Sequence, residues 1–166
     1  LAWKALRHAS AMVSFEAYQP VLEQVRTLLP AGSSITVLAD RGFLHEQLIR
    51  YTQQHHWHYR IRMLGSTLVQ QPHHAVRAVE QLRPAPGSAH FYHNVTIFGT
   101  AISPVHLVVA QPADAPDDPW YIASDELTSQ QTLTEYGLRF DIEETFLDDK
   151  SGGFQVQTSE LQTPEA

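Results

Sequence analysis

The amino-acid sequence predicts an α/β fold that ends in a long helix. The first third of the chain alternates strand-like and helix-like segments, an order typical of a sheet with helical crossovers. The middle contains short β-rich runs separated by turns. The segment from Thr128 to Asp149 then has helical periodicity.

The composition is that of an ordinary globular domain. The chain has 166 residues, 43% of them hydrophobic, which suits one domain with a real core. It has no cysteine, which excludes disulfides and thiolate metal sites. No apolar run approaches the roughly 20 residues of a membrane span. These features favour a cytoplasmic protein without a membrane partner.

The net charge of −7 constrains how the chain can contact nucleic acid. Affinity for phosphates comes largely from Lys and Arg, so an acidic chain is a poor candidate for a module that coats DNA. Any contact with nucleic acid is expected to be local and catalytic. Scattered acidic residues are also compatible with an ordinary solvated surface.

The first elements follow from local signals. Residues 1–8 resemble a strand. A helix is expected next, with Ser14 as its candidate N-cap, Pro20 near its start, and a stop at residues 30–32. The run Ile35–Ala39 is short and β-rich, which suits a buried parallel strand.

The next two elements complete the expected alternation. Leu44, Leu48 and Tyr51 recur at helical spacing. Residues 57–63 alternate apolar side chains with His58, Arg60 and Arg62, which predicts a strand with one polar face.

The middle of the chain reads as a β-rich insertion. Prolines and a glycine interrupt residues 72–89, and strand-like runs follow at His90–Phe98 and Val105–Ala110. An acidic, proline-rich loop covers residues 112–119, and residues 120–123 form another short strand.

The last helix carries the strongest functional signal. At 100° per residue, Tyr136, Arg139, Glu143 and Lys150 lie in one stripe about 60° wide. Apolar residues flank this stripe on both sides, so it is expected to face the protein body. Two interpretations remain open: Arg139 and Glu143 form an ordinary i, i+4 ion pair, or Glu143 binds a metal while the two cations hold phosphates.

Asp40 is the candidate partner of that stripe. It follows the strand Ile35–Ala39, and ligands of open α/β sheets bind at the carboxyl ends of strands. The alternative is that Asp40 caps the next helix. Mg²⁺ and Mn²⁺ prefer hard oxygen ligands, and two such metals can drive phosphoryl transfer. Because Asp40 and Glu143 are far apart in the sequence, only the fold can bring them together.

These residues resemble a known family. The pattern Tyr136-x₂-Arg139-x₃-Glu143-x₆-Lys150 is similar at all four positions to the YREK signature of DDE-type insertion-sequence transposases of the IS-four family. The segment Val37–Phe43 resembles the block around the second catalytic Asp of that family.

The resemblance implies a ribonuclease-H-like fold with a β-strand insertion before the last catalytic helix. It also implies Mg²⁺-dependent (or Mn²⁺-dependent) cleavage and strand transfer at a two-metal site. Asp40 and Glu143 would be the catalytic metal ligands, while Tyr136, Arg139 and Lys150 would contact DNA. The implied partners are transposon-end DNA, target DNA and, in the complete protein, a second transposase subunit. The implied location is bacterial cytoplasm, at the nucleoid during action.

One departure qualifies this interpretation. The first Asp of the family lies on the first strand of the sheet, whereas the earliest acidic residue here is Glu16, at a helix start. We therefore expect a fold incomplete at its N-terminus, with that Asp upstream of Leu1, and a chain that is inactive alone. The alternative function is a truncated product that binds and blocks full-length transposase, or a non-functional remnant.

The expected domain organisation follows from this resemblance. Residues 1–64 would supply ribonuclease-H-like strands and helices, and 65–126 the β-rich insertion. Residues 127–150 would form the catalytic helix, and 151–166 a polar tail. The whole chain, residues 1–166, would be part of a transposase catalytic domain.

Three further signals receive less weight. The histidine clusters at residues 55–58 and 73–74 lack the spacing of a known zinc motif. Arg60 and Arg62 fit a solvated strand face better than a DNA channel. Trp120 fits a core aromatic better than a platform for a flipped base.

Overall fold

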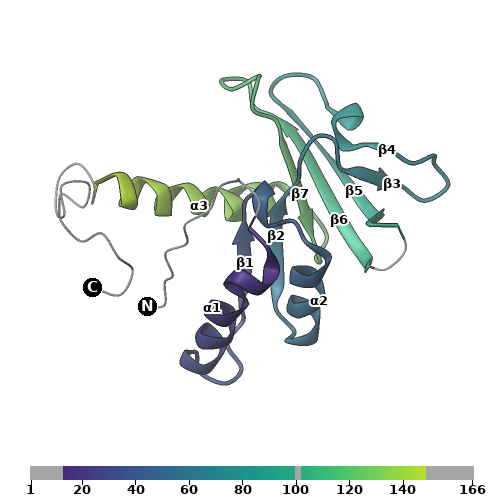
Figure 1. Ribbon diagram of the computed structural model, residues 1–166. Coiled ribbons are helices and arrows are strands. Elements are labelled where there is room, and N and C mark those ends of the chain that lie inside the picture. The colour runs from purple at the N-terminus through teal and green to yellow at the C-terminus, as the bar shows by residue number, and fades with distance from the viewer. Residues whose placement is uncertain (1–12, 100–101, 149–166) are drawn as a thin grey trace.

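The computed structural model describes residues 13–99 and 102–148, except for the side chains of residue 103 and residues 141–148. Figure 1 shows a twisted sheet with helices packed on it. The elements, in chain order, are α1 (Phe15–Leu28), β1 (Thr36–Ala39), the 3₁₀ turn η1 (Arg41–Phe43), α2 (Glu46–Gln54), β2 (His58–Arg62), β3 (Leu68–Gln70), β4 (Arg77–Ala78), the 3₁₀ turn η2 (Val79–Leu82), β5 (Ser88–Ile97), β6 (Ile102–Gln111), β7 (Trp120–Ser124) and α3 (Gln130–Asp148).

The seven described strands form one mixed sheet in the order β1-β2-β7-β6-β5-β3-β4. β1 and β2 are parallel, with α2 as the crossover between them, whereas the other pairs are antiparallel. β7 pairs with β2 and β6 pairs with β7, so the strands of the expected insertion extend the sheet that β1 and β2 begin.

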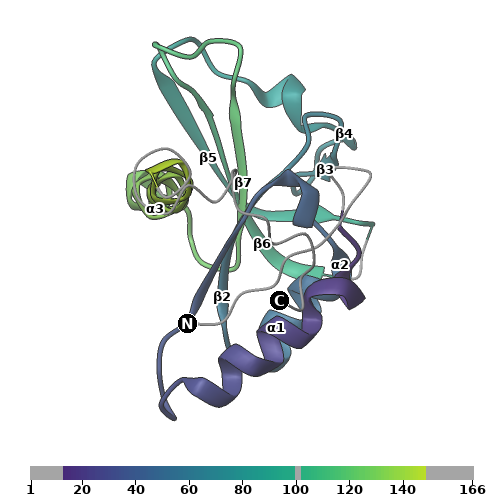
Figure 2. The same ribbon diagram turned by 60° about the vertical axis from the view of Figure 1, so that its left-hand side comes forward.

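The helices cover both faces of the sheet (Figure 2). α1 and α2 pack on one face, where Phe15, Leu48 and Ile49 join the main core with alternate residues of the central strands. α3 lies on the other face, where Tyr136 packs against Val108 and Ile122. The side-chain alternation of β6 and β7 therefore decides which residue meets which helix.

The predicted elements of the described region are confirmed within a few residues, and two strands were missed. Ser14 is the N-cap of α1, as expected, and Pro20 lies inside that helix. β3 lies just before the proline-interrupted segment and β4 lies inside it; both strands are too short to show a clear alternation. The strand expected at residues 1–8 and the tail at 151–166 lie outside the described residues.

None of the helices in the described part of the chain is both long enough and apolar enough to cross a membrane.

Candidate active site at the carboxyl end of β1

Asp40 follows β1 directly, at the carboxyl end of the parallel pair. Val37 and Ala39 belong to the core under α1 and α2. Because side chains alternate along a strand, Leu38 and Asp40 belong to the opposite face, which is the face that α3 covers.

The Asp40 carboxylate also caps the turn that follows it. Its Oδ1 accepts a hydrogen bond of 2.8 Å from the backbone N–H of Arg41, at the start of η1. The capping interpretation is therefore correct, but it does not exclude the other. One hydrogen bond to Oδ1 holds the side chain in place and leaves Oδ2 available as a ligand.

α3 presents Tyr136 to the sheet, as the helical periodicity predicts. Tyr136 is fully buried, and Arg139 is half-buried on the same stripe. Leu138, which at 100° per residue falls on the side of the helix opposite the stripe, is 55% exposed. The orientation of α3 predicted from its sequence is therefore confirmed for its described side chains.

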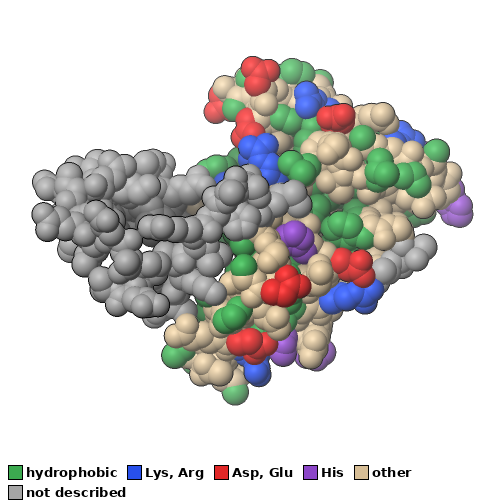
Figure 3. Space-filling view, viewed as in Figure 1, with side chains coloured by type: hydrophobic (Ala, Val, Ile, Leu, Met, Phe, Trp, Pro, Cys, Tyr) green, Lys and Arg blue, Asp and Glu red, His purple; other side chains and the backbone are tan. Residues whose placement is uncertain are grey.

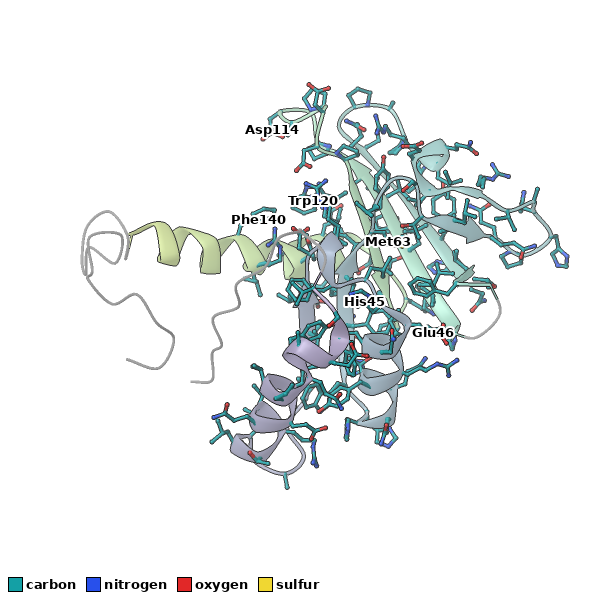
Figure 4. All side chains as sticks on the ribbon, viewed as in Figure 1. His45, Glu46, Met63, Asp114, Trp120 and Phe140 are labelled. Atoms are coloured by element: carbon teal, nitrogen blue, oxygen red, sulfur yellow. The ribbon has the colours of Figure 1, made fainter. Side chains whose placement is uncertain are left out.

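An aromatic cluster holds this part of α3 against β7. The Trp120 ring lies 5.6 Å from Tyr136 and stacks on Phe140 at 5.5 Å, centroid to centroid. Figure 4 shows Phe140 and Trp120 side by side, from the helix and the strand respectively. The guanidinium carbon of Arg139 lies 4.9 Å from the Phe140 ring centroid, a cation–π contact. The expectation that Trp120 is a packed aromatic is correct.

The fold brings Asp40 within electrostatic range of this helix. α3 packs against both β1 and β2. Burial raises the pKa of the Tyr136 hydroxyl; Arg139 lowers that pKa, Asp40 raises it, and Arg62 lowers it. Asp40, Arg62, Tyr136 and Arg139 therefore gather where α3 crosses the ends of β1 and β2.

Of the other two residues of the stripe, the structure describes only the backbone of Glu143. Glu143 lies on α3, two turns beyond Tyr136 and on the same stripe, but its side chain is outside the described set. In Figure 1, α3 continues past the edge of the sheet on the side of β1. Lys150 lies outside the described residues altogether.

The polar face of β2 is buried, so the expectation of a solvated face is wrong. Arg60 and Arg62 are each 5% exposed because α3 and the segments around β7 cover them. Arg62 pairs with Asp118 and donates a 3.0 Å hydrogen bond to the carbonyl oxygen of Pro119. Carboxylates surround Arg60, so its guanidinium is not free to line a DNA channel either.

Arg60 and its acidic partners form a cluster that the sequence did not reveal. The guanidinium contacts Glu126 at 2.6 Å and Glu135 at 2.9 Å, and Asp125 at 3.5 Å. Arg60, as the largest cause, lowers the pKa of Glu126. Its partners lie 65 to 75 positions away in the sequence, so no local pattern could have indicated them.

Three ligand-type side chains of this cluster lie close enough to hold a metal ion: His58, Asp125 and Glu126, whose candidate atoms fall within 4.8 Å of one another. The Glu126 oxygen is already bonded to Arg60, and Asp125 Oδ2 pairs with His58 Nδ1 at 2.7 Å. A guanidinium at hydrogen-bond distance opposes a second cation there. We therefore interpret this group as an ion-pair network.

A small polar hollow lies beside Arg41, the residue that follows Asp40. Its volume is about 210 Å³, and its lining includes Arg41, Arg62 and Arg83 together with acidic side chains from residues 80, 117 and 118. A larger, mostly apolar hollow of about 550 Å³ opens on the other side of Arg41, over β3 and the end of β5. Of the two hollows, only the polar one offers several guanidinium donors, although Arg62 already pairs with Asp118 and Arg83 already donates to Tyr121.

The donor set at Asp40 suits a hard divalent cation. The site offers a carboxylate held by a backbone N–H at a strand end, with the stripe of α3 crossing the same face. On the face shown in Figure 3, acidic and basic side chains of the described residues are scattered, without one continuous basic patch. Local chemistry therefore fits this molecule better than broad electrostatic attachment to DNA.

Comparison with known protein families identifies the family of this chain. The family model described as the transposase DDE domain matches residues 14–166. The same search found no matching curated protein and no matching solved structure.

Proposed function

Because the chain belongs to the transposase DDE domain family, we propose that it provides part of the metal-dependent site that cleaves and joins DNA during transposition. The family implies phosphoryl transfer on DNA. The observation that carries the proposal is the packing of α3 against β1 and β2, which brings Tyr136 within electrostatic range of Asp40 at the end of β1. In a catalytic site that uses carboxylates from distant segments, such a crossing brings the ligands together.

Within that family, we assign the chain to the IS-four group with its YREK signature. Support comes from the stripe of α3, in which Tyr136 is buried and Arg139 half-buried. We also propose a ribonuclease-H-like arrangement. The parallel pair β1 and β2, joined through α2 and crossed by α3, supports that assignment.

Asp40 and Glu143 are the proposed metal ligands, with Mg²⁺ or Mn²⁺ as the metal. Both supply the carboxylate oxygens that these ions prefer. When bound, the metal activates the attacking oxygen and stabilises the leaving oxygen of the scissile phosphate. The Arg41 backbone N–H fixes the Asp40 carboxylate, so that its second oxygen is oriented before substrate arrives.

The cations and the tyrosine of α3 have the role of substrate holders. Arg139 and Lys150 are expected to neutralise DNA phosphates near the cleaved end. Tyr136, the third residue assigned to DNA contact, is fully buried in the free chain, so it can reach a phosphate only if this part of α3 moves when DNA binds. Arg41 at the polar hollow can receive the next phosphate of the same strand. The expected substrates are transposon-end DNA and target DNA, bound by a dimer of the complete transposase.

Metal binding tests the proposal more directly than DNA cleavage does, because the carboxylates of Asp40 and Glu143 are sufficient to bind a metal ion. We would titrate the purified chain with Mn²⁺ and follow free Mn²⁺ by electron paramagnetic resonance. Asp40→Asn and Glu143→Gln should each weaken binding at least tenfold. Asp114→Asn, in the exposed loop before β7, is the matched control and should bind like the wild type (Figure 4).

Equal binding by Asp40→Asn and the wild type would refute the assignment of the site. Turnover gives a second, separate result. A two-carboxylate site is expected to bind metal without cleaving DNA by itself. Mg²⁺-dependent nicking by the purified chain that Glu143→Ala abolishes would overturn that expectation of inactivity.

A further inference from the structure

Arg60 is a buried arginine whose partners come from different segments of the fold. Its Nε donates to Glu135 on α3 at 2.9 Å, and one terminal nitrogen contacts Glu126 at 2.6 Å. The other terminal nitrogen donates to the backbone oxygen of Tyr59 at 2.9 Å and to Ser124 Oγ at 3.1 Å. One side chain on β2 is thus bonded to β7, to the connection that follows it, and to α3.

The Arg60 guanidinium is well suited to holding its bonded segments in one fixed arrangement. A guanidinium has a planar fork of donors, so it satisfies several acceptors in one geometry and resists rotation. A buried guanidinium is costly unless its donors are paired, which also opposes any shift that breaks a bond. The connection between β7 and α3 is held in the same way, because Ser124 Oγ accepts from the Glu126 backbone N–H at 2.9 Å.

Glu135 is the point at which this network reaches α3. It directly precedes Tyr136, so holding Glu135 on Arg60 sets the rotation of the helix that buries Tyr136. Glu143 lies eight residues further, about 12 Å along the axis at 1.5 Å per residue. A tilt of about 10° at Glu135 would therefore move the backbone at Glu143 by about 2 Å. Metal ligation tolerates only about 0.2 Å.

We propose that Arg60 is a positioning residue for the catalytic helix: through Glu135 it sets the rotation and tilt of α3, and so the distance between Glu143 and Asp40. This inference rests on the proposed function for its consequence, metal binding. Its structural part, the orientation of α3 relative to β1, does not depend on that function.

The first test measures the orientation of α3 without metal. Because the chain has no cysteine, a spin label can be placed at Ser34→Cys, before β1, and another at Leu138→Cys, on the exposed side of α3. In this doubly labelled chain, Glu135→Gln should broaden or shift the distance distribution measured by pulsed electron paramagnetic resonance. A distance distribution that Glu135→Gln leaves identical to that of the doubly labelled chain with Glu135 intact would overturn the proposal.

The second test measures the consequence for Mn²⁺ binding in the unlabelled chain. Arg60→Lys keeps the charge but cannot bond Glu126 and Glu135 in one fork. We expect Arg60→Lys and Glu135→Gln each to lower Mn²⁺ affinity about tenfold, and the double variant to lower it no further. Because these variants lose a buried hydrogen bond, they should also unfold at lower urea concentration. Affinity is therefore measured without urea, in variants whose circular dichroism matches the wild type, so that a loss of affinity reports a changed geometry and not unfolding.

The exposed pair Arg50 and Glu46 on α2 supplies the matched controls, since it has a similar contact of 2.6 Å at the surface. Arg50→Lys and Glu46→Gln should change neither the distances nor the affinity. A wild type that binds no Mn²⁺ would refute the proposed function, while the spin-label distances would still decide the role of Arg60. Additive losses in the double variant would contradict a shared Arg60–Glu135 contact.

Discussion

Truncating Tyr136 should separate what its ring does from what its hydroxyl does. The ring is fully buried, packs on Val108 and Ile122, and lies 5.6 Å from Trp120. Tyr136→Ala removes the ring and leaves a cavity between α3 and the sheet. Tyr136→Phe keeps the ring and removes the hydroxyl alone.

The expected magnitudes differ widely. Replacing a buried aromatic residue by Ala costs about 3–5 kcal/mol. Loss of the Arg139 contact, whose guanidinium carbon lies 5.7 Å from the Tyr136 centroid, adds about 0.5–1 kcal/mol. Domains are stable by about 5–15 kcal/mol, so Tyr136→Ala should remove a large part of the stability. Tyr136→Phe should change it by less than about 1 kcal/mol, because little packing is lost.

Urea unfolding followed by far-ultraviolet circular dichroism gives these free energies. Leu138→Ala is the matched control on the same helix, because Leu138 is 55% exposed; it should stay within about 0.5 kcal/mol of the wild type. A loss below about 1 kcal/mol for Tyr136→Ala would refute the packing of α3 on the sheet.

Two other expectations concern stability. Burial, together with His93, lowers the pKa of His106, while Asp125 raises it; the net lowering means that the folded state binds fewer protons than the unfolded one. The stability that neutral His106 contributes is complete above pH 6.5, the pKa of the unfolded chain, and is lost as the pH falls below that value. The urea midpoint of the wild type should therefore fall between pH 7 and pH 5. The midpoint of His106→Gln should fall less over the same range. A wild type and variant with equal pH slopes would exclude this origin. Asn94 has φ 54° at a register shift of β5, so Asn94→Val should cost about 1–2 kcal/mol in the same assay and Asn94→Gly little; equal losses in both variants would point away from the backbone.

Elements with periodic side chains were predictable from the sequence. The helical periodicity of α3 predicted that the stripe containing Tyr136 faces the protein body, and Tyr136 is buried there. The place of Asp40 at the end of a strand was predictable, because a short apolar run followed by a carboxylate is a local signal. Such signals need no knowledge of distant contacts.

Features that depend on pairing between distant segments were not predictable. Arg60 alternates with apolar residues in β2 and so suggested a solvated face, yet α3 covers it. Its partner Glu135 lies 75 positions further along the chain. The short strands β3 and β4 were missed for a related reason: β3 is defined by its pairing with β5, and β4 by its pairing with β3, rather than by local alternation.

The central claim is that Asp40 and Glu143 bind one metal. Replacing Mg²⁺ by Fe²⁺ with ascorbate and peroxide cleaves a backbone next to the bound ion, and mass spectrometry locates the cuts. We expect cuts around Asp40 and around Glu143, both suppressed by excess Mg²⁺ and both weakened in Asp40→Asn. Cuts near Asp40 without any near Glu143, or cuts confined to Asp125 and Glu126, would contradict the account.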